Sequence, residues 1–94
     1  MVSNHFIIAN EVGLHARPAA LFVQKAAKFK SIVKVRNATR GTPFMDAKSI
    51  LSVMGLGVAK DHEIEVTAEG EDEQTALEAI ARLIESDFVE SAAT

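Results

Sequence analysis

The chain has 94 residues, of which 48% are hydrophobic, so it can form one small hydrophobic core but not two. Its lack of cysteine excludes disulfides, thiolate metal ligands and cysteine nucleophiles, and suits a reducing compartment. The net charge of −3 and the absence of Trp and Tyr argue against nucleic-acid binding. No apolar run is long enough to span a membrane and no signal-peptide pattern opens the chain, so we expect a cytoplasmic protein without membrane insertion.

The first predicted element is a strand at residues 5–9. Phe6, Ile7 and Ile8 form an unbroken apolar run, which favours a strand inside a sheet. Residues 10–13 then form a tight connection, in which Gly13 allows a backbone geometry that other residues resist. This connection leads into a helix, so it places His15 at the edge of the molecule.

The second element is a helix that ends near Phe29. Its apolar residues recur at three- and four-residue intervals, as on one buried helical face: Ala19, Phe22, Val23 and Ala26. Pro18 fits only the first turn, where a backbone N–H group has no intrahelical acceptor. His15 therefore lies at or beside the N-cap, and the N–H groups of Ala16 and Arg17 point outward past its imidazole.

The imidazole of His15 and the guanidinium of Arg17 suggest phosphoryl chemistry at this helix end. A neutral imidazole nitrogen is a competent nucleophile near neutral pH, and histidine forms covalent intermediates. A phosphate-sized anion on His15 would meet the positive end of the helix dipole, the free N–H groups and the planar donors of Arg17. The alternative is an ordinary surface histidine beside a solvated arginine, and the His-x-Arg pattern alone leaves both open.

Residues 31–36 alternate between Val33 and Val35 on one side and Lys34 and Arg36 on the other, as in a half-buried strand. A turn follows at residues 37–41, and a second candidate strand covers residues 42–45. Pro43 has no N–H group to donate to a ladder, so this strand should lie at the edge of the sheet or begin at the proline.

A short helix is expected within residues 46–57, capped by either Ser49 or Asp46. Val53 turns towards the interior of the protein. Three other apolar side chains share one face of this helix: Ile50, Leu51 and Met54. Core packing is the simpler explanation of that face, and docking of a partner protein is the alternative.

The remaining elements are a strand at residues 63–68 and a helix that starts near Asp72 and ends near Phe88. The strand alternates, with Ile64, Val66 and Ala68 directed inward. The helix buries a regular set of apolar residues: Ala76, Leu77, Ile80, Leu83 and Ile84. Residues 90–94 are small and polar enough to fray. None of the three histidines has a second ligand at metal spacing, so we predict no metal site.

These elements give one domain, residues 1–94, in the order strand, helix, strand, strand, helix, strand, helix. Three helices on one face of a four-stranded, mainly antiparallel sheet make an α+β fold, the open-faced β-sandwich. Residues 1–60 hold nine Lys or Arg against two Asp or Glu, a balance of +7, and residues 61–94 hold one against eleven, a balance of −10. If His15 lies on the basic part, its natural partner is acidic.

Three spaced segments resemble the HPr family, the histidine phosphocarriers of the bacterial phosphoenolpyruvate-dependent phosphotransferase system. They are Gly-Leu-His-Ala-Arg-Pro-Ala at residues 13–19, Ala-Lys-Ser-Ile at residues 47–50 and Ala-Glu-Gly-Glu-Asp-Glu-Gln at residues 68–74. The resemblance implies that His15 accepts a phosphoryl group on its pros nitrogen from phospho-enzyme I and passes it to enzyme IIA proteins in sugar uptake. It also implies that Arg17 and the backbone of Ala16 and Arg17 stabilise this group without a cofactor, in a relay protein rather than a free-standing enzyme.

The resemblance further implies a docking surface beside His15 and a regulatory serine. The docking positions of the family match four residues here: Ala20, Ile50, Leu51 and Met54. Ser49 matches the position that HPr kinase/phosphorylase modifies in some members, although a capping role explains this serine equally well. We expect a monomer. Two alternatives stay open: NPr, the nitrogen-branch paralogue with the same chemistry, and a regulatory binding module whose His15 is seldom phosphorylated.

Overall fold

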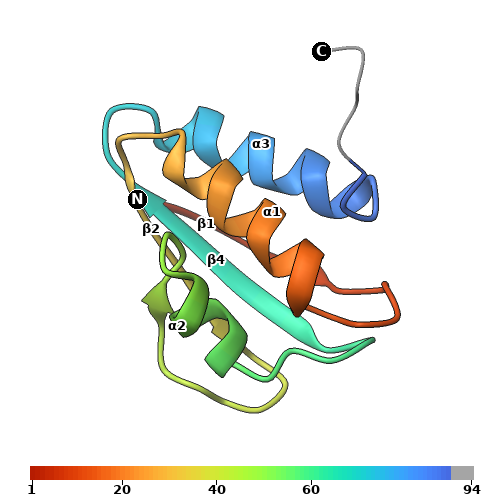
Figure 1. The fold of residues 1–94 in the computed structure, drawn as a ribbon. Helices are drawn as coiled ribbons and strands as arrows, with labels where there is room; N and C mark the ends of the chain where they lie inside the picture. Colours follow the sequence, from red (N-terminus) through yellow and green to blue (C-terminus); the bar gives the residue numbers. More distant parts are fainter. Residues whose placement is uncertain (90–94) are drawn as a thin grey trace.

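The computed structural model describes residues 1–89, and within them one antiparallel sheet carries the helices on one of its faces (Figure 1). Along the chain the elements are β1 (Val2–Ile7), α1 (Ala16–Ala27), β2 (Ile32–Asn37), β3 (Met45–Asp46), α2 (Ile50–Gly55), β4 (Glu63–Glu69) and α3 (Glu73–Glu85). The strand order is β1-β4-β2-β3. The predicted open-faced β-sandwich and its element order are confirmed, while the tail predicted to fray lies outside the described residues.

The central strand is β4, which pairs antiparallel with β1 on one side and with β2 on the other. Ile64, Val66 and Ala68 are fully buried under the helices, as their alternation predicts. Phe22 of α1 and Ile80 of α3 are also fully buried, so these two helices complete the core. In the described part of the chain, every helix is too short or too polar to span a bilayer.

β1 differs from its prediction in both extent and position. It covers Val2–Ile7 rather than residues 5–9, and it is an edge strand rather than an interior one. Phe6 and Ile8 are buried, but Ile7 is 55% exposed. An unbroken apolar run predicts burial on both faces, whereas here helices cover only one face, so Ile7 points to solvent.

The second edge strand, β3, is shorter than predicted, with Met45–Asp46 in place of residues 42–45. It lies at the edge of the sheet after Pro43, as expected of a residue without an N–H group. α1 ends at Ala27, earlier than predicted, because the next N–H groups bond three residues back instead of four: Lys28 to Lys25 at 3.2 Å and Phe29 to Ala26 at 3.3 Å.

The carboxylate of Asp72 joins the turn before β2 to the turn before α3. It accepts the backbone N–H groups of Lys30 and Ser31, each at 2.9 Å, and the hydroxyl of Ser31. The hydroxyl of Ser31 and the backbone donors favour the charged carboxylate, so they hold the pKa of Asp72 below its usual value. This clamp fixes where α3 begins relative to the end of α1.

The lowered pKa of Asp72 predicts that this clamp weakens in acid. A carboxylate whose pKa is lower in the folded state stabilises the fold above its unfolded pKa, about 4, and loses that effect as the pH falls through the folded pKa. We expect the urea midpoint to fall less steeply in Asp72→Asn than in the wild type between about pH 5 and pH 2. Glu71→Gln, at an exposed neighbouring carboxylate, should keep the wild-type slope. Equal slopes in Asp72→Asn and the wild type would contradict the assignment.

Candidate functional site

His15 occupies the N-cap position of α1, as predicted, with an extended backbone at φ −139° and ψ 153°. Its side chain is exposed and makes no capping hydrogen bond. The preceding residue, Leu14, is buried, and its N–H group donates to the carbonyl of Val58 at 3.1 Å. A buried anchor therefore presents an imidazole that no described residue engages.

The first turn of α1 leaves hydrogen-bond donors free beside His15. Within residues 1–89, the N–H groups of Ala16 and Arg17 have no acceptor, and the exposed guanidinium of Arg17 has no ion pair. Ala16 has a φ of 52°, in the left-handed region that costs a residue with a Cβ about 1–2 kcal/mol. Backbone donors, the helix dipole and a guanidinium together can receive an anion at this end of the helix.

Gly13 brings the loop that carries His15 into direct contact with residues 57–62. Its φ is +65°, and a Cβ at this position would lie 2.0 Å from the carbonyl oxygen of Val58. The carbonyl of Gly13 also accepts a hydrogen bond from the side-chain amide of Asn10 at 2.8 Å. Gly13 therefore permits close packing as well as the turn that the sequence predicts.

The start of α2 is fixed by its own cap and by a contact with the turn that follows α1. The hydroxyl of Ser49 accepts the N–H group of Ser52 at 3.3 Å, so Ser49 is the cap. Asp46, the rival, instead accepts the N–H group of Lys48 at 2.9 Å in the turn before the helix. Nζ of Lys48 donates to the carbonyl of Phe29 at 2.7 Å. Ser49 is half-buried in this junction.

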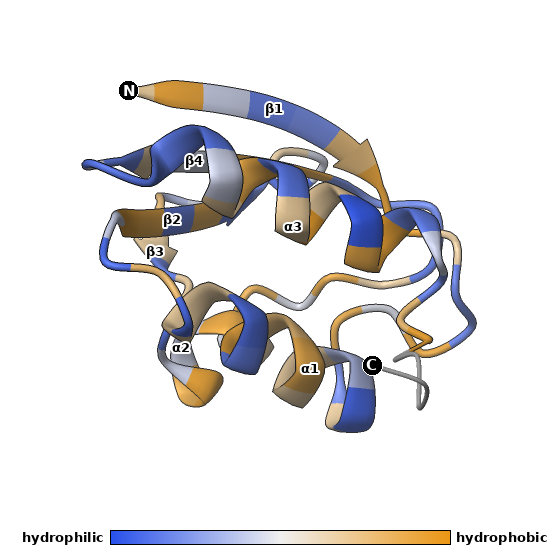
Figure 2. Ribbon diagram, turned by 90° about the horizontal axis from the view of Figure 1, so that it is seen from above, coloured by the Kyte–Doolittle hydropathy of each residue, from blue (hydrophilic) through white to orange (hydrophobic). Residues whose placement is uncertain are grey.

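The predicted docking residues belong to α1 and α2, two helices that pack side by side (Figure 2). Leu51 is 81% exposed and Ile50 is 38% exposed, whereas Met54 and Ala20 are half-buried. Val53 is fully buried, as predicted. Core packing therefore accounts for Val53 and for part of Met54, but it does not account for Leu51.

Sequence reasoning missed two features near this surface. An open groove of about 430 Å³ lies beside α2, and Pro43, Met45 and Leu51 are among the residues that line it. The fully buried side chain of Asn37 forms a hydrogen bond with the ring of His62 at 3.1 Å. The hydrogen bond joins residues 25 positions apart, and the groove depends on how β3 and α2 pack, so no local pattern signals either feature.

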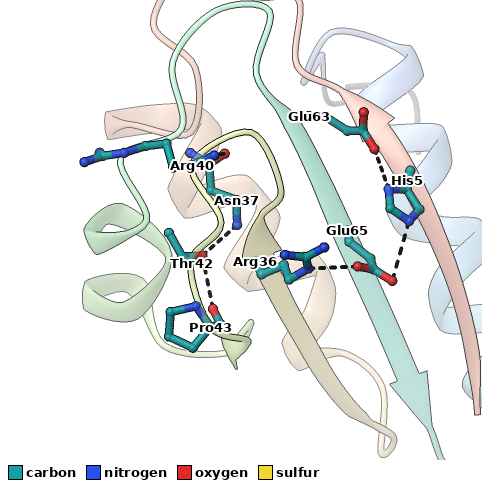
Figure 3. A network of polar contacts seen from close by, with 8 residues as sticks. All are labelled: His5, Arg36, Asn37, Arg40, Thr42, Pro43, Glu63 and Glu65. Atoms are coloured by element: carbon teal, nitrogen blue, oxygen red, sulfur yellow. Dashed lines mark hydrogen bonds and ion pairs between the residues drawn. The ribbon is translucent and has the colours of Figure 1, made fainter.

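The uncovered face of the sheet carries a network of ion pairs (Figure 3). His5 on β1 lies between two carboxylates of β4, with Nδ1 2.5 Å from Glu63 and Nε2 3.5 Å from Glu65. Arg36 on β2 binds Glu65 at 2.8 Å and lies over the ring of Phe44. No group of three or more His, Asp or Glu within residues 1–89 is arranged to hold a metal ion.

Comparison with known proteins identifies the family. The model of the PTS-HPr family, described as the PTS HPr component phosphorylation site, matches residues 2–86. The chain belongs to the HPr family. Phosphocarrier protein HPr of Treponema pallidum is 44% identical over 91 residues, which make up 96% of this chain and 99% of that protein.

Longer relatives contain a matching region. The chain is 41% identical to part of the multiphosphoryl transfer protein of Haemophilus influenzae and 44% identical to part of that of Vibrio cholerae. These alignments cover 86% and 80% of the chain, but they span only 16% and 19% of the two longer proteins.

Solved structures of HPr proteins have the same fold. HPr-C-His from Thermoanaerobacter tengcongensis superposes with a TM-score of 0.89 at 45% identity, covering 97% of this chain and 99% of that one. HPr from Bacillus anthracis gives a TM-score of 0.81 at 36% identity, covering 88% and 95%. The HPr family and the open-faced β-sandwich inferred from the sequence are confirmed.

The contact between Gly13 and Val58 generates a prediction about stability. Gly13→Ala should lower the free energy of unfolding by about 2 kcal/mol or more, because the methyl group overlaps the carbonyl of Val58 and φ is positive. Gly55→Ala is the matched control, since no heavy atom lies within 4 Å of a Cβ there. Urea unfolding measures both changes, and similar values for the two variants would contradict the packing argument.

Proposed function

We propose that His15 accepts a phosphoryl group on Nδ1, the pros nitrogen, from phospho-enzyme I and passes it to enzyme IIA proteins in sugar uptake. The observation that carries this proposal is the exposed, unengaged imidazole at the N-terminus of α1, beside free backbone donors. Membership of the HPr family supports it. In each step one P–N bond forms as another breaks, so the chain needs no cofactor and acts as a relay.

Arg17 and the backbone N–H groups of Ala16 and Arg17 are the proposed stabilising groups. They speed transfer only if they bind the phosphoryl group more strongly in the transition state than in the phosphohistidine. An arginine with no other ion pair within residues 1–89 can follow the charge as it develops. Arg17 therefore acts in both directions, towards the donor and towards the acceptor.

The proposed docking surface combines Ala20 of α1 with Ile50, Leu51 and Met54 of α2. Flexible apolar side chains suit a surface that must accept several partners in turn. The unpaired charge of Arg17 beside them favours partners with an acidic face. A monomer in the cytoplasm leaves this surface accessible to both enzyme I and enzyme IIA proteins.

Ser49 is the proposed regulatory site for a kinase of the HPr kinase/phosphorylase type. Its hydroxyl already receives the N–H group of Ser52, and a phosphate on the same oxygen would keep an acceptor there. The added negative charge would lie on α2 beside Leu51 and repel an acidic partner. Modification would then block docking while the fold remains intact.

Labelling from phosphoenolpyruvate tests the proposed function. With enzyme I and labelled phosphoenolpyruvate, the wild type should acquire acid-labile, base-stable label, and His15→Ala should acquire none. His5→Ala, which removes another exposed histidine, should label like the wild type.

Parallel reactions with the enzyme I paralogues of the sugar and nitrogen branches separate HPr from NPr. The faster of the two reactions identifies the branch, and we expect it to be the sugar branch because the matching relatives are HPr proteins. No label with an active enzyme I of either kind would favour the regulatory binding module instead.

The exposure of Leu51 predicts an effect of docking on transfer. Leu51→Glu should raise the KM for this protein as a substrate of enzyme I by about tenfold, because it replaces an apolar contact with a repelling charge. Ile32→Glu is the control, since Ile32 is 62% exposed on the opposite face of the sheet. Circular dichroism first checks that both variants are folded, and steady-state kinetics then gives the KM of each. Equal KM values for the two variants would contradict the assigned surface.

A further inference from the structure

The loop that carries His15 rests on residues 57–62 through backbone hydrogen bonds. Ile8 donates to the carbonyl of His62 at 2.9 Å and accepts the N–H group of Asp61 at 2.6 Å. At the other end of the loop, Leu14 donates to the carbonyl of Val58 at 3.1 Å. The position of His15 therefore depends on how firmly residues 57–62 are held.

The ring of His62 holds this segment in place. Its Nδ1 accepts the backbone N–H group of Ala59 across the turn at 3.1 Å, and it also lies 3.1 Å from Nδ2 of the buried Asn37. The same Nδ2 donates to the carbonyl of Leu56 at 3.1 Å, at the end of α2. One imidazole nitrogen thus ties the turn to the end of β2 and, through Asn37, to the end of α2.

The surrounding groups determine the hydrogen-bonding role of the His62 ring. Oδ1 of Asn37 accepts the backbone N–H group of Arg40 at 3.1 Å, and its Nδ2 faces the carbonyl of Leu56, so the amide can have only one orientation. Nδ1 of His62 therefore faces two donors, the amide of Asn37 and the N–H group of Ala59. In this arrangement Nδ1 acts as an acceptor, so the ring hydrogen lies on Nε2.

We propose that neutral His62 is a positioning residue for phosphoryl transfer at His15, an inference that rests on the proposed function. It acts through the segment it holds and touches neither the phosphoryl group nor the partner. Without an acceptor at this position, the N–H group of Ala59 and the buried amide of Asn37 would each lose a partner, and the segment beneath Leu14 would loosen.

Within residues 1–89, no ion pair contributes to holding the ring of His62. Lys60, Asp61 and Glu63 flank His62 in the chain and Arg40 lies on the connection after β2, and none of the four forms an ion pair with the His62 ring within residues 1–89. Glu63 is engaged by His5 on the uncovered face of the sheet. The fit of His62 therefore depends on its hydrogen bonds rather than on an ion pair.

Two substitutions separate the acceptor role of His62 from its volume. His62→Asn keeps an acceptor near the position of Nδ1 but cannot titrate, whereas His62→Phe keeps the ring and loses the acceptor. Hydrogen exchange at the Leu14 amide should become about tenfold faster in His62→Phe, with little change in His62→Asn or at the core amide of Val66. His5→Phe is the matched control and should leave Leu14 unchanged.

Transfer from phospho-enzyme I supplies a second readout. His62→Phe should lower kcat by about tenfold with KM nearly unchanged, because it replaces no residue of the docking surface, and His62→Asn should restore most of the lost kcat.

Each outcome is decisive for one of the two proposals. If the wild type is labelled while Leu14 exchange and kcat are unchanged in His62→Phe, the positioning role is overturned and the phosphocarrier function stands. If His62→Asn behaves like His62→Phe, the acceptor role is overturned. If the wild type takes no label from an active enzyme I, the proposed function fails, and the positioning role fails with it.

Discussion

The contact between Gly13 and the carbonyl of Val58 is the constraint on which the site depends. The backbones approach so closely that a methyl group on Gly13 has no room, and Leu14 uses the same carbonyl as its hydrogen-bond acceptor. This contact fixes the point at which the chain leaves the sheet layer and enters α1. Because α1 begins only two residues after Leu14, the same contact also fixes His15 as the residue at the N-cap position. The adjacent burial of Leu14 and exposure of His15 follow from this one contact.

A phosphoryl carrier must be held firmly and yet remain reachable, and the two requirements fall on different residues. The backbone before His15 is held by the buried Leu14, by the close packing of Gly13 and by residues 57–62, which we propose that His62 supports. Reachability comes from the His15 ring, which makes no capping bond and so leaves the backbone donors of the first turn free. A conventional Ser or Asp cap would satisfy one of those donors and remove it from the site. α1 therefore lacks the stabilisation of a side-chain cap, and an anion bound at His15 could supply that stabilisation instead.

Local patterns predicted the parts of the fold that depend on neighbouring residues. The periodicity around Phe22, the place of Pro18 and the alternation of β4 were enough to place α1, His15 and the core. The interior position predicted for β1 was wrong, because an apolar run does not show how many faces of its sheet are covered. The bond between Asn37 and His62 spans 25 residues, and a turn histidine beside a buried amide has no sequence signature. The residue types around His15 are enough to predict a phosphoryl site there, whereas the contacts that hold its loop in place are tertiary and cannot be predicted from local sequence.

The distribution of charge follows from where the acids are used. Two acids of β4, Glu63 and Glu65, pair with His5 and Arg36 on the uncovered sheet face, and Asp72 is committed to the turn before β2. These three acids are engaged elsewhere, and Arg17 at the N-terminus of α1 forms no ion pair within residues 1–89. Under the proposed function, an unneutralised guanidinium beside an exposed apolar face would attract an acidic partner that covers Leu51. A carboxylate added near His15 would satisfy Arg17 internally and weaken both the proposed anion site and the proposed docking surface, so the free charge of Arg17 is itself part of the proposed mechanism.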